Sequence, residues 1–193
     1  MRDYRVWLER ALNLVTVILG LVAAYLVATE RLIPALREEP TAVDVGERLV
    51  GRIEFDRLAV VPGSRGGDRI RVPGQGAVLM LVYSSTCPAC YANLAAWDRA
   101  VRAAESVASV LSVALEEDLP AARAYARRYL PSTVAVIPKD ARRLTGAFGI
   151  GIVPSTILVG EDGTVSFMRQ GSLDQIALDS LVSALEALRG PSI

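Results

Sequence analysis

Hydrophobic positions follow two different patterns along this chain. Residues 11–29 form one uncharged and almost wholly apolar run, whereas from about residue 49 short apolar runs alternate with amphipathic stretches. The first run has nineteen residues, which at about 1.5 Å each in a helix come close to the ~30 Å thickness of a bilayer's hydrocarbon core. The second pattern is typical of an α/β domain. The chain is therefore predicted to combine a membrane segment with a folded domain.

The N-terminal run predicts a single transmembrane anchor at residues 11–30. Tyr4 and Trp7 precede it, where interfacial aromatic residues are common, and arginines are in slight excess on that side. This arrangement favours a cytoplasmic segment at residues 1–10 and a linker at residues 31–48. The linker contains two prolines within residues 34–48 and shows little periodicity.

Two alternatives to a retained anchor stay open. A cleaved signal peptide would use the small residues at 22–24, although its apolar core is usually only about 7–15 residues long. A buried helix of a soluble domain would show an amphipathic stripe, and none is visible. The anchor and the signal peptide both place the folded domain outside the cytoplasm.

Residues 49–193 are predicted to form the folded domain. Strands are expected at 57–61, 69–72, 77–83, 107–115, 132–137, 155–159 and 164–168, and helices at 88–105, 118–130, 139–148 and 173–188. This order predicts an α/β fold with a central mixed, mostly parallel sheet and helices on both faces. The first two strands and the last two are expected to form antiparallel hairpins.

Composition excludes several classes of function. Lys and Arg (21) balance Asp and Glu (21), which argues against a nucleic-acid-binding domain with a basic stripe. The chain has no histidine, so it has neither a Ser-His-Asp triad nor a Cys-His pair. Its two cysteines are too few for the disulfide framework of a small secreted protein.

Both cysteines lie in one motif, Ser-Ser-Thr-Cys-Pro-Ala-Cys at residues 84–90, between a predicted strand and a predicted helix. Cys87 would lie at the helix N-terminus, where free backbone N–H groups and the helix dipole favour a thiolate. Pro88 suits the first helical turn. Cys90, three residues later, would lie within disulfide reach and resolve a mixed disulfide that Cys87 forms.

The two cysteines also have other interpretations. A zinc site needs about four ligands, and the chain has no second cysteine pair and no histidine. Two thiolates could bind Cu(I) as a copper carrier. A structural disulfide across so short a ring would contribute little stability. Cys-x-x-Cys at a strand-to-helix junction favours redox chemistry over these alternatives.

A second motif, Gly-Ile-Gly-Ile-Val-Pro-Ser-Thr-Ile-Leu-Val at residues 149–159, begins a predicted strand with a proline. Together with the cysteine motif and the Glu-Asp-Gly-Thr-Val turn after it, this sequence resembles the thioredoxin-like superfamily. It is most similar to the membrane-anchored TlpA and ResA kind. The resemblance implies that Pro154 is cis and faces the cysteines, and that Val153 offers backbone groups to an extended substrate. It also implies substrate contact at Thr86 and Pro88.

The sequence departs from this family at two positions. Thr86 stands where many thioredoxins have a tryptophan, and Leu81 stands where they have a buried carboxylate that accepts the proton of the second cysteine. Glu116 or Glu117 could replace that carboxylate, or both could be surface charges. The cysteine motif also resembles MauD-like accessory proteins of methylamine dehydrogenase maturation, which are associated with disulfide formation. The direction of electron flow therefore stays open.

The resemblance implies a membrane-tethered, periplasmic thiol–disulfide oxidoreductase with no cofactor beyond a redox-active Cys87–Cys90 disulfide. Its partners would be protein thiols and disulfides, in cytochrome c or metalloprotein maturation, and a membrane electron carrier of the CcdA or DsbD type. The alternative from another class is a non-catalytic assembly subunit or a copper carrier. A peroxidase is disfavoured, because the proline of the peroxiredoxin pattern is absent before Cys87.

Overall fold

A computed structural model describes residues 13–23, 25, 42–58 and 69–189. The chain divides into two units, Met1–Pro40 and Thr41–Ile193. In the first unit, residues 13–23 are helical and exposed. Among the described residues, no helix is both long enough and apolar enough to cross a membrane. The other positions of the predicted anchor, apart from residue 25, lie outside the described residues, as does the predicted cytoplasmic segment.

The second unit is built on a seven-stranded sheet in the order β2-β1-β5-β4-β3-β6-β7. The strands are β1 (Ile53–Arg57), β2 (Ile70–Val72), β3 (Ala77–Tyr83), β4 (Ala108–Ala114), β5 (Val134–Pro138), β6 (Ser155–Val159) and β7 (Val165–Gln170). The central strands β3, β4 and β5 are parallel to one another. The pairs β1–β2, β1–β5, β3–β6 and β6–β7 are antiparallel. The sheet is therefore mixed.

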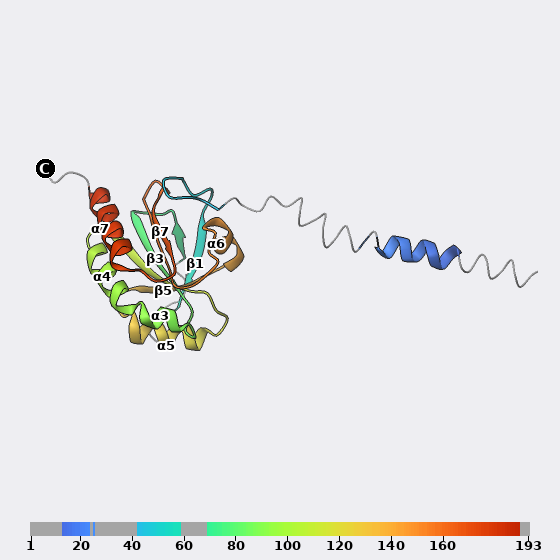
Figure 1. Ribbon diagram of the computed structural model, residues 1–193, viewed down its shortest axis with the longest axis horizontal. Coiled ribbons are helices and arrows are strands. Elements are labelled where there is room, and N and C mark those ends of the chain that lie inside the picture. Colours follow the sequence, from blue (N-terminus) through green and yellow to red (C-terminus); the bar gives the residue numbers. More distant parts are fainter. Residues whose placement is uncertain (1–12, 24, 26–41, 59–68, 190–193) are drawn as a thin grey trace, which may run out of the picture. The chain divides into compact units, whose positions relative to one another are not determined.

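Helices cover both faces of this sheet, as the alternating pattern predicted. They are α3 (Pro88–Ala92), α4 (Leu94–Ala104), α5 (Leu119–Tyr129), α6 (Ala141–Ala147) and α7 (Gln175–Arg189). Figure 1 shows α3, α4, α5 and α7 on one face, here called the helix-rich face, and α6 on the other, here called the α6 face. The steps β3 to β4 and β4 to β5 run the same way across the sheet, so right-handed crossovers place α3, α4 and α5 on one face.

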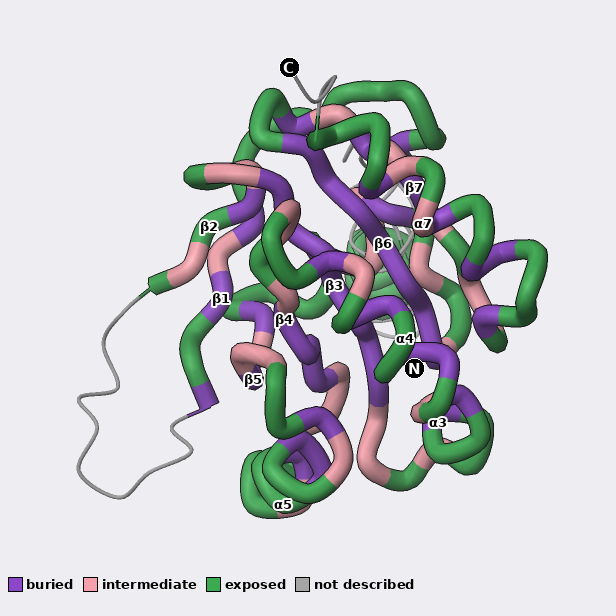
Figure 2. Tube along the Cα trace, turned by 90° about the vertical axis from the view of Figure 1, so that its left-hand side faces the viewer, coloured by how far each residue is buried: buried purple, intermediate pink, exposed green. Residues whose placement is uncertain are grey.

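Strand β3 is buried along its whole length and supplies both halves of the core. Figure 2 shows that the neighbouring strands β3 and β6 are both buried along their length. Side chains of a strand alternate between the two faces. Leu79, Leu81 and Tyr83 accordingly pack on the helix-rich face, and Val78, Met80 and Val82 pack on the α6 face. A strand buried on both faces reads as a continuous apolar run, which is why the sequence located it correctly.

Three features differ from the sequence-based expectations. The first described strand is Ile53–Arg57, which pairs with β2, and residues 59–61 of the strand predicted at 57–61 lie outside the described residues. The sheet is not mostly parallel, since four of its six described strand pairs are antiparallel. The sequence did not show this, because an apolar run buried on both faces looks the same in a parallel and in an antiparallel strand. The compact unit also includes residues 42–48, which were assigned to the linker. Within that stretch Val43 is buried and the Gly46 N–H donates to the Val165 carbonyl at 2.8 Å.

The single helix predicted at 88–105 is two helices that meet at Asn93. The Asn93 side chain is 3% exposed, and its Oδ1 accepts a hydrogen bond from the Leu173 N–H at 2.8 Å. Asparagine side chains that bond to backbone groups compete with helix continuation. This break leaves α3 as a short helix, with Cys87 as its N-cap and Cys90 in its first turn.

Candidate active site

Cys87 is the N-cap residue of α3, the position that the sequence predicted for it. Its backbone is extended (φ −86°, ψ 110°), and its Sγ accepts a hydrogen bond from the Cys90 N–H at 3.2 Å. Pro88 follows in the first turn, where the missing N–H removes no helical bond. Cys87 is partly exposed. A donor N–H and access to solvent together suit a thiolate that attacks a partner's disulfide.

Cys90 has a very different environment, because its side chain is fully buried. Burial raises the pKa of the Cys90 thiol to about 12, since the buried anion loses its hydration. Its hydrogen bond with the Cys87 side chain and the charges of Cys87 and Glu116 act in the same direction, and a backbone hydrogen bond from Ser84 opposes them. Cys90 is therefore held as a neutral thiol near pH 7.

The segment just before β6 comes close to Cys87. The Val153–Pro154 peptide bond is cis, as the family resemblance implied. The Cys87 Sγ–H donates to the Val153 carbonyl oxygen at 3.5 Å, a contact between residues 66 positions apart. The structure thus brings together Cys87, Cys90, Val153 and Pro154, four of the predicted site residues.

The loop before Pro154 is held by a side chain from β7. Gln170 Nε2 donates to the Gly149 carbonyl at 2.8 Å, and Gln170 Oε1 accepts from the Gly151 N–H at 2.9 Å. Ser155 Oγ donates to the Ile152 carbonyl at 2.7 Å. These bonds explain why the Val153 carbonyl stays directed at the cysteine. The sequence did not reveal Gln170, because nothing local to it marks a partner some twenty residues away.

The surface around Cys87 includes the two remaining predicted residues. Thr86 and Pro88 are both exposed on either side of Cys87. Tyr91 is 42% exposed and Ile152 57% exposed. Apolar and aromatic exposure beside a reactive thiol is suited to binding a protein segment. The parts that these residues play in a reaction stay predictions.

Glu116 is partly buried and holds the loop that leads to Cys87. Its carboxylate accepts hydrogen bonds from the Ser85 N–H at 2.9 Å and from Ser85 Oγ at 2.6 Å. Glu117 is exposed, and Leu81 is fully buried. Of the two glutamates that the sequence left open, Glu116 is the one bound to the cysteine loop. Charge-assisted hydrogen bonds of this kind are about twice as strong as neutral ones, so this carboxylate fixes the loop firmly.

A cluster of four tyrosines, which the sequence did not predict, lies beside the cysteines. The Tyr125 ring stacks on Tyr83 with centroids 4.7 Å apart, and it contacts Tyr91 at 5.0 Å and Tyr129 at 5.1 Å. Tyr83 ends β3, Tyr91 follows Cys90, and the other two are on α5. The pair at 125 and 129 lies on one face of a helix, which was a visible signal. We call this group the tyrosine cluster.

A metal centre finds little support in the described part of the chain. No group of three or more His, Cys, Asp or Glu residues there could hold a metal ion. The two thiols of Cys87 and Cys90 are soft ligands of the type that Cu(I) accepts.

Comparisons with known proteins identify the fold. No protein-family model matches the chain, and no curated protein matches it significantly. Solved structures do. They include StoA from Bacillus subtilis (TM-score 0.53, 16% identity, covering 70% of this chain and 98% of that one). Another is the thioredoxin domain of a thiol-disulfide oxidoreductase from Bacteroides vulgatus, with a TM-score of 0.58 and 13% identity, covering 76% of this chain and 98% of that one. A third is a secreted disulfide oxidoreductase from Mycobacterium tuberculosis, with a TM-score of 0.53 and 15% identity, covering 70% of this chain and 95% of that one. The likeness shows a thioredoxin-like fold.

Proposed function

We propose that this thioredoxin-like chain is a thiol–disulfide oxidoreductase that acts on protein disulfides through Cys87 and Cys90. One observation carries the proposal. The Cys87 sulfur lies between a donor, the Cys90 N–H at 3.2 Å, and an acceptor, the Val153 carbonyl at 3.5 Å. An accessible thiol at a helix N-terminus and a buried second thiol three residues later are the two groups that disulfide exchange requires.

The exchange runs in two steps. The Cys87 thiolate attacks one sulfur of a partner's disulfide, the partner's S–S bond breaks, and the other partner sulfur leaves and takes up a proton. The Cys90 thiolate then attacks Cys87 Sγ, the mixed disulfide breaks, and the partner's second thiol is released. The partner disulfide gains two electrons and the Cys87–Cys90 pair loses two. Reversing both steps oxidises a partner dithiol.

Substrate binding would use the surface next to Cys87. An extended partner segment would pair with the Val153 backbone before Pro154, a form of β-augmentation. Thr86 and Pro88 would contact the same segment from the other side of the sulfur, since both are exposed. This placement would align a partner's disulfide with Cys87.

We further propose that residues 11–30 tether the domain to the membrane, with residues 1–10 in the cytoplasm and the catalytic domain in the periplasm. The uncharged run and the arginines before it support this orientation. A membrane electron carrier of the CcdA or DsbD type would then renew the dithiol, and the substrates would belong to cytochrome c or metalloprotein maturation. N-terminal sequencing of the mature protein tests the anchor, because a start at Tyr25 would show a cleaved signal peptide.

Trapping of mixed disulfides tests the exchange mechanism. A Cys90→Ser variant should accumulate covalent complexes with protein substrates, since the second step is blocked. A Cys87→Ser variant should form none and should lose insulin disulfide reduction. Full reduction by Cys87→Ser would overturn the mechanism. Tight Cu(I) binding by a wild-type chain that exchanges no disulfide would instead support the copper-carrier alternative.

The reduction potential of the Cys87–Cys90 pair decides the direction of electron flow. A value near about −270 mV, like thioredoxin, would indicate a reductase, and one near about −120 mV, like DsbA, an oxidase. Equilibration with glutathione buffers, followed by alkylation of free thiols, measures this potential directly.

A further inference from the structure

The resolving step has an energetic problem in this structure. Cys90 must become a thiolate to attack the mixed disulfide, yet its side chain is fully buried. A buried anion is strongly unfavourable unless hydrogen-bond donors surround it. The buried carboxylate that many thioredoxins have is replaced by Leu81, as the sequence showed. The backbone hydrogen bond from Ser84 favours the Cys90 thiolate, and a second donor would favour it further as it forms.

Tyr125 has an unused donor in the buried cluster that also contains Cys90. Its side chain is 3% exposed, and its hydroxyl is one of two buried side-chain atoms without a hydrogen-bond partner in the described residues. The other is Asn93 Nδ2. Leaving a buried hydroxyl unpaired is destabilising, so such groups are rare in folded proteins and often have a function.

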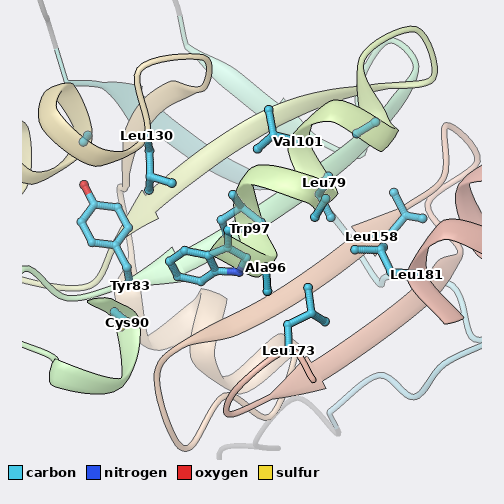
Figure 3. Packing of buried hydrophobic residues seen from close by; sticks show 14 of the residues in the cluster. Leu79, Tyr83, Cys90, Ala96, Trp97, Val101, Leu130, Leu158, Leu173 and Leu181 are labelled. Carbon is cyan, nitrogen blue, oxygen red and sulfur yellow. The ribbon is translucent and has the colours of Figure 1, made fainter. Parts of the chain in front are cut away.

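The tyrosine cluster holds the Tyr125 ring against the segments that carry the cysteines. Tyr125 lies between Tyr83, from which the chain continues toward Cys87, and Tyr91, the residue after Cys90. Cys90, Tyr83 and Tyr125 belong to one packed cluster, and Figure 3 shows Tyr83 next to Cys90. Three rings contacting Tyr125 leave its side chain little freedom. The Tyr125 side chain is therefore held within the same buried cluster as the Cys90 thiol.

Neighbouring hydroxyls of this cluster are already occupied. Tyr83 Oη donates to the Ala122 carbonyl at 2.9 Å, and Tyr91 Oη donates to the Ser85 carbonyl at 3.0 Å. Neither can turn to Cys90 without breaking its bond. Tyr125 can offer its proton without such a loss, which separates it from both neighbours.

The charges around this hydroxyl keep it a donor. Burial raises the pKa of Tyr125, and negative charge on Cys90 raises it further, followed by Tyr91, Tyr83 and Cys87. The phenol therefore stays protonated while Cys90 ionises. The titratable groups that act on Cys90 itself are Cys87 and Glu116.

We propose that Tyr125 is a positioning residue for the second step, whose hydroxyl donates a hydrogen bond to the Cys90 thiolate when that thiolate forms. Tyr125 keeps its own proton throughout. The proton of the Cys90 thiol passes to the partner sulfur that leaves, so the atoms and electrons of the exchange are unchanged. The inference rests on the proposed function, because it assigns Cys90 as the resolving thiol.

Single-turnover reaction with a chromogenic aromatic disulfide, 5,5′-dithiobis(2-nitrobenzoic acid), tests this proposal in the full chain. The first thionitrobenzoate released reports attack by Cys87, and the second reports attack by Cys90. Tyr125→Phe should leave the first phase unchanged and slow the second about tenfold at pH 7, the usual scale for a hydrogen bond to a charged group. Tyr129→Phe, from the same cluster, is the matched control and should change the second phase less than about twofold.

A pH series separates this role from simple packing. The second-phase rates of wild type and Tyr125→Phe should converge at alkaline pH, where Cys90 ionises without help, whereas a packing defect would slow all pH values alike. Tyr125→Phe should also be at least as stable as wild type in urea, since it removes an unpaired buried hydroxyl. Equal second-phase rates in wild type and Tyr125→Phe would overturn this inference alone. Absence of a second phase in wild type would overturn it together with the proposed function.

Discussion

The two faces of one sheet have different kinds of core. On the α6 face the buried cluster consists of aliphatic residues, Met80 and the two phenylalanines Phe55 and Phe148. On the helix-rich face the cluster contains Cys90, two tyrosines and Trp97, and the neighbouring Asn93 has an unpaired amide nitrogen. Both faces use residues of the same strands, in alternation.

This difference separates stability from chemistry. An apolar cluster contributes free energy through burial alone and contains no polar group that needs a partner. The helix-rich face buries a thiol and two phenols whose pKa values are raised by burial. Buried polar groups of this kind reduce stability and are typical of functional sites. We therefore expect changes on the α6 face to alter folding, and changes on the helix-rich face to alter the reaction as well.

The largest expected effect on stability is that of Phe148→Ala on the α6 face. Phe148 is fully buried, and removing such a ring should lower the free energy of unfolding by about 3–5 kcal/mol, because a cavity remains. Urea denaturation measures this, and disulfide exchange per folded molecule should stay at the wild-type level.

Ile176→Ala is the control for that experiment, because Ile176 is 80% exposed. Its effect on stability should stay within about 0.5 kcal/mol. Loss of exchange activity in folded Phe148→Ala would break the proposed separation between the two faces.

Trp97→Phe should have the next largest effect, on the helix-rich face. Trp97 Nε1 donates to Thr156 Oγ1 at 2.9 Å in a buried position. The variant leaves that hydroxyl unpaired, which should lower the free energy of unfolding by about 1–3 kcal/mol. Combining it with Thr156→Val should recover part of the loss, because both partners are then apolar. A double variant whose loss is the plain sum of the two single losses would argue against this account of the pair.

Alkaline pH should destabilise the protein through the helix-rich face. Cys90 has an ordinary pKa of 9.0 and a folded pKa of about 12. Below pH 9 both states hold the proton, whereas between pH 9 and 12 the unfolded chain releases it and the folded chain does not. Stability should therefore fall as the pH rises through this range, by at most about 1.4 kcal/mol per pH unit for one group.

Tyr83 and Tyr125 should add to this loss from about pH 10 upward, because burial raises the pKa of each above its ordinary value of 10.0. Urea midpoints measured from pH 8 to 11 for wild type and Cys90→Ala test the assignment. The decline should begin at higher pH in Cys90→Ala. Identical profiles for the two proteins would exclude Cys90 as a source.

Glu116→Gln should have the smallest effect. The amide oxygen can still accept a hydrogen bond from Ser85, but the negative charge that raises the pKa of Cys90 is lost. The pKa of Cys90 should fall, and the second exchange step should become about two- to threefold faster at neutral pH. Stopped-flow release of thionitrobenzoate measures the change.

Glu116→Ala is the comparison for that variant, because it removes both hydrogen bonds to Ser85. Its cysteine loop should lose its anchor, and both exchange steps should slow. If Glu116→Gln and Glu116→Ala slowed both exchange steps equally, the charged hydrogen bond to the cysteine loop would matter more than the effect of Glu116 on the pKa of Cys90.

Much of the fold could be read from local patterns. The strand at 77–83 and the strand at 155–159 match the structure in full, because an apolar run of that length between turn residues has few other outcomes. The helix predicted at 118–130 is observed at Leu119–Tyr129, with Asp118 as its N-cap. The strand at Ile53–Arg57 was not predicted, although its buried Ile53 and Phe55 alternate with charged residues.

The sequence by itself determined where Cys87 and Cys90 lie, because a strand-to-helix junction and an N-terminal proline are local features. Tertiary structure alone decided the antiparallel pairing of β1 with β5 and of β3 with β6, the contact of Cys87 with Val153 and that of Glu116 with Ser85. The same holds for the tyrosine cluster around Cys90. Cys87 and Val153 are 66 positions apart in the sequence, and Glu116 and Ser85 are 31 positions apart. Local patterns encode backbone conformation and burial, but which side chains meet depends on how distant segments cross the sheet.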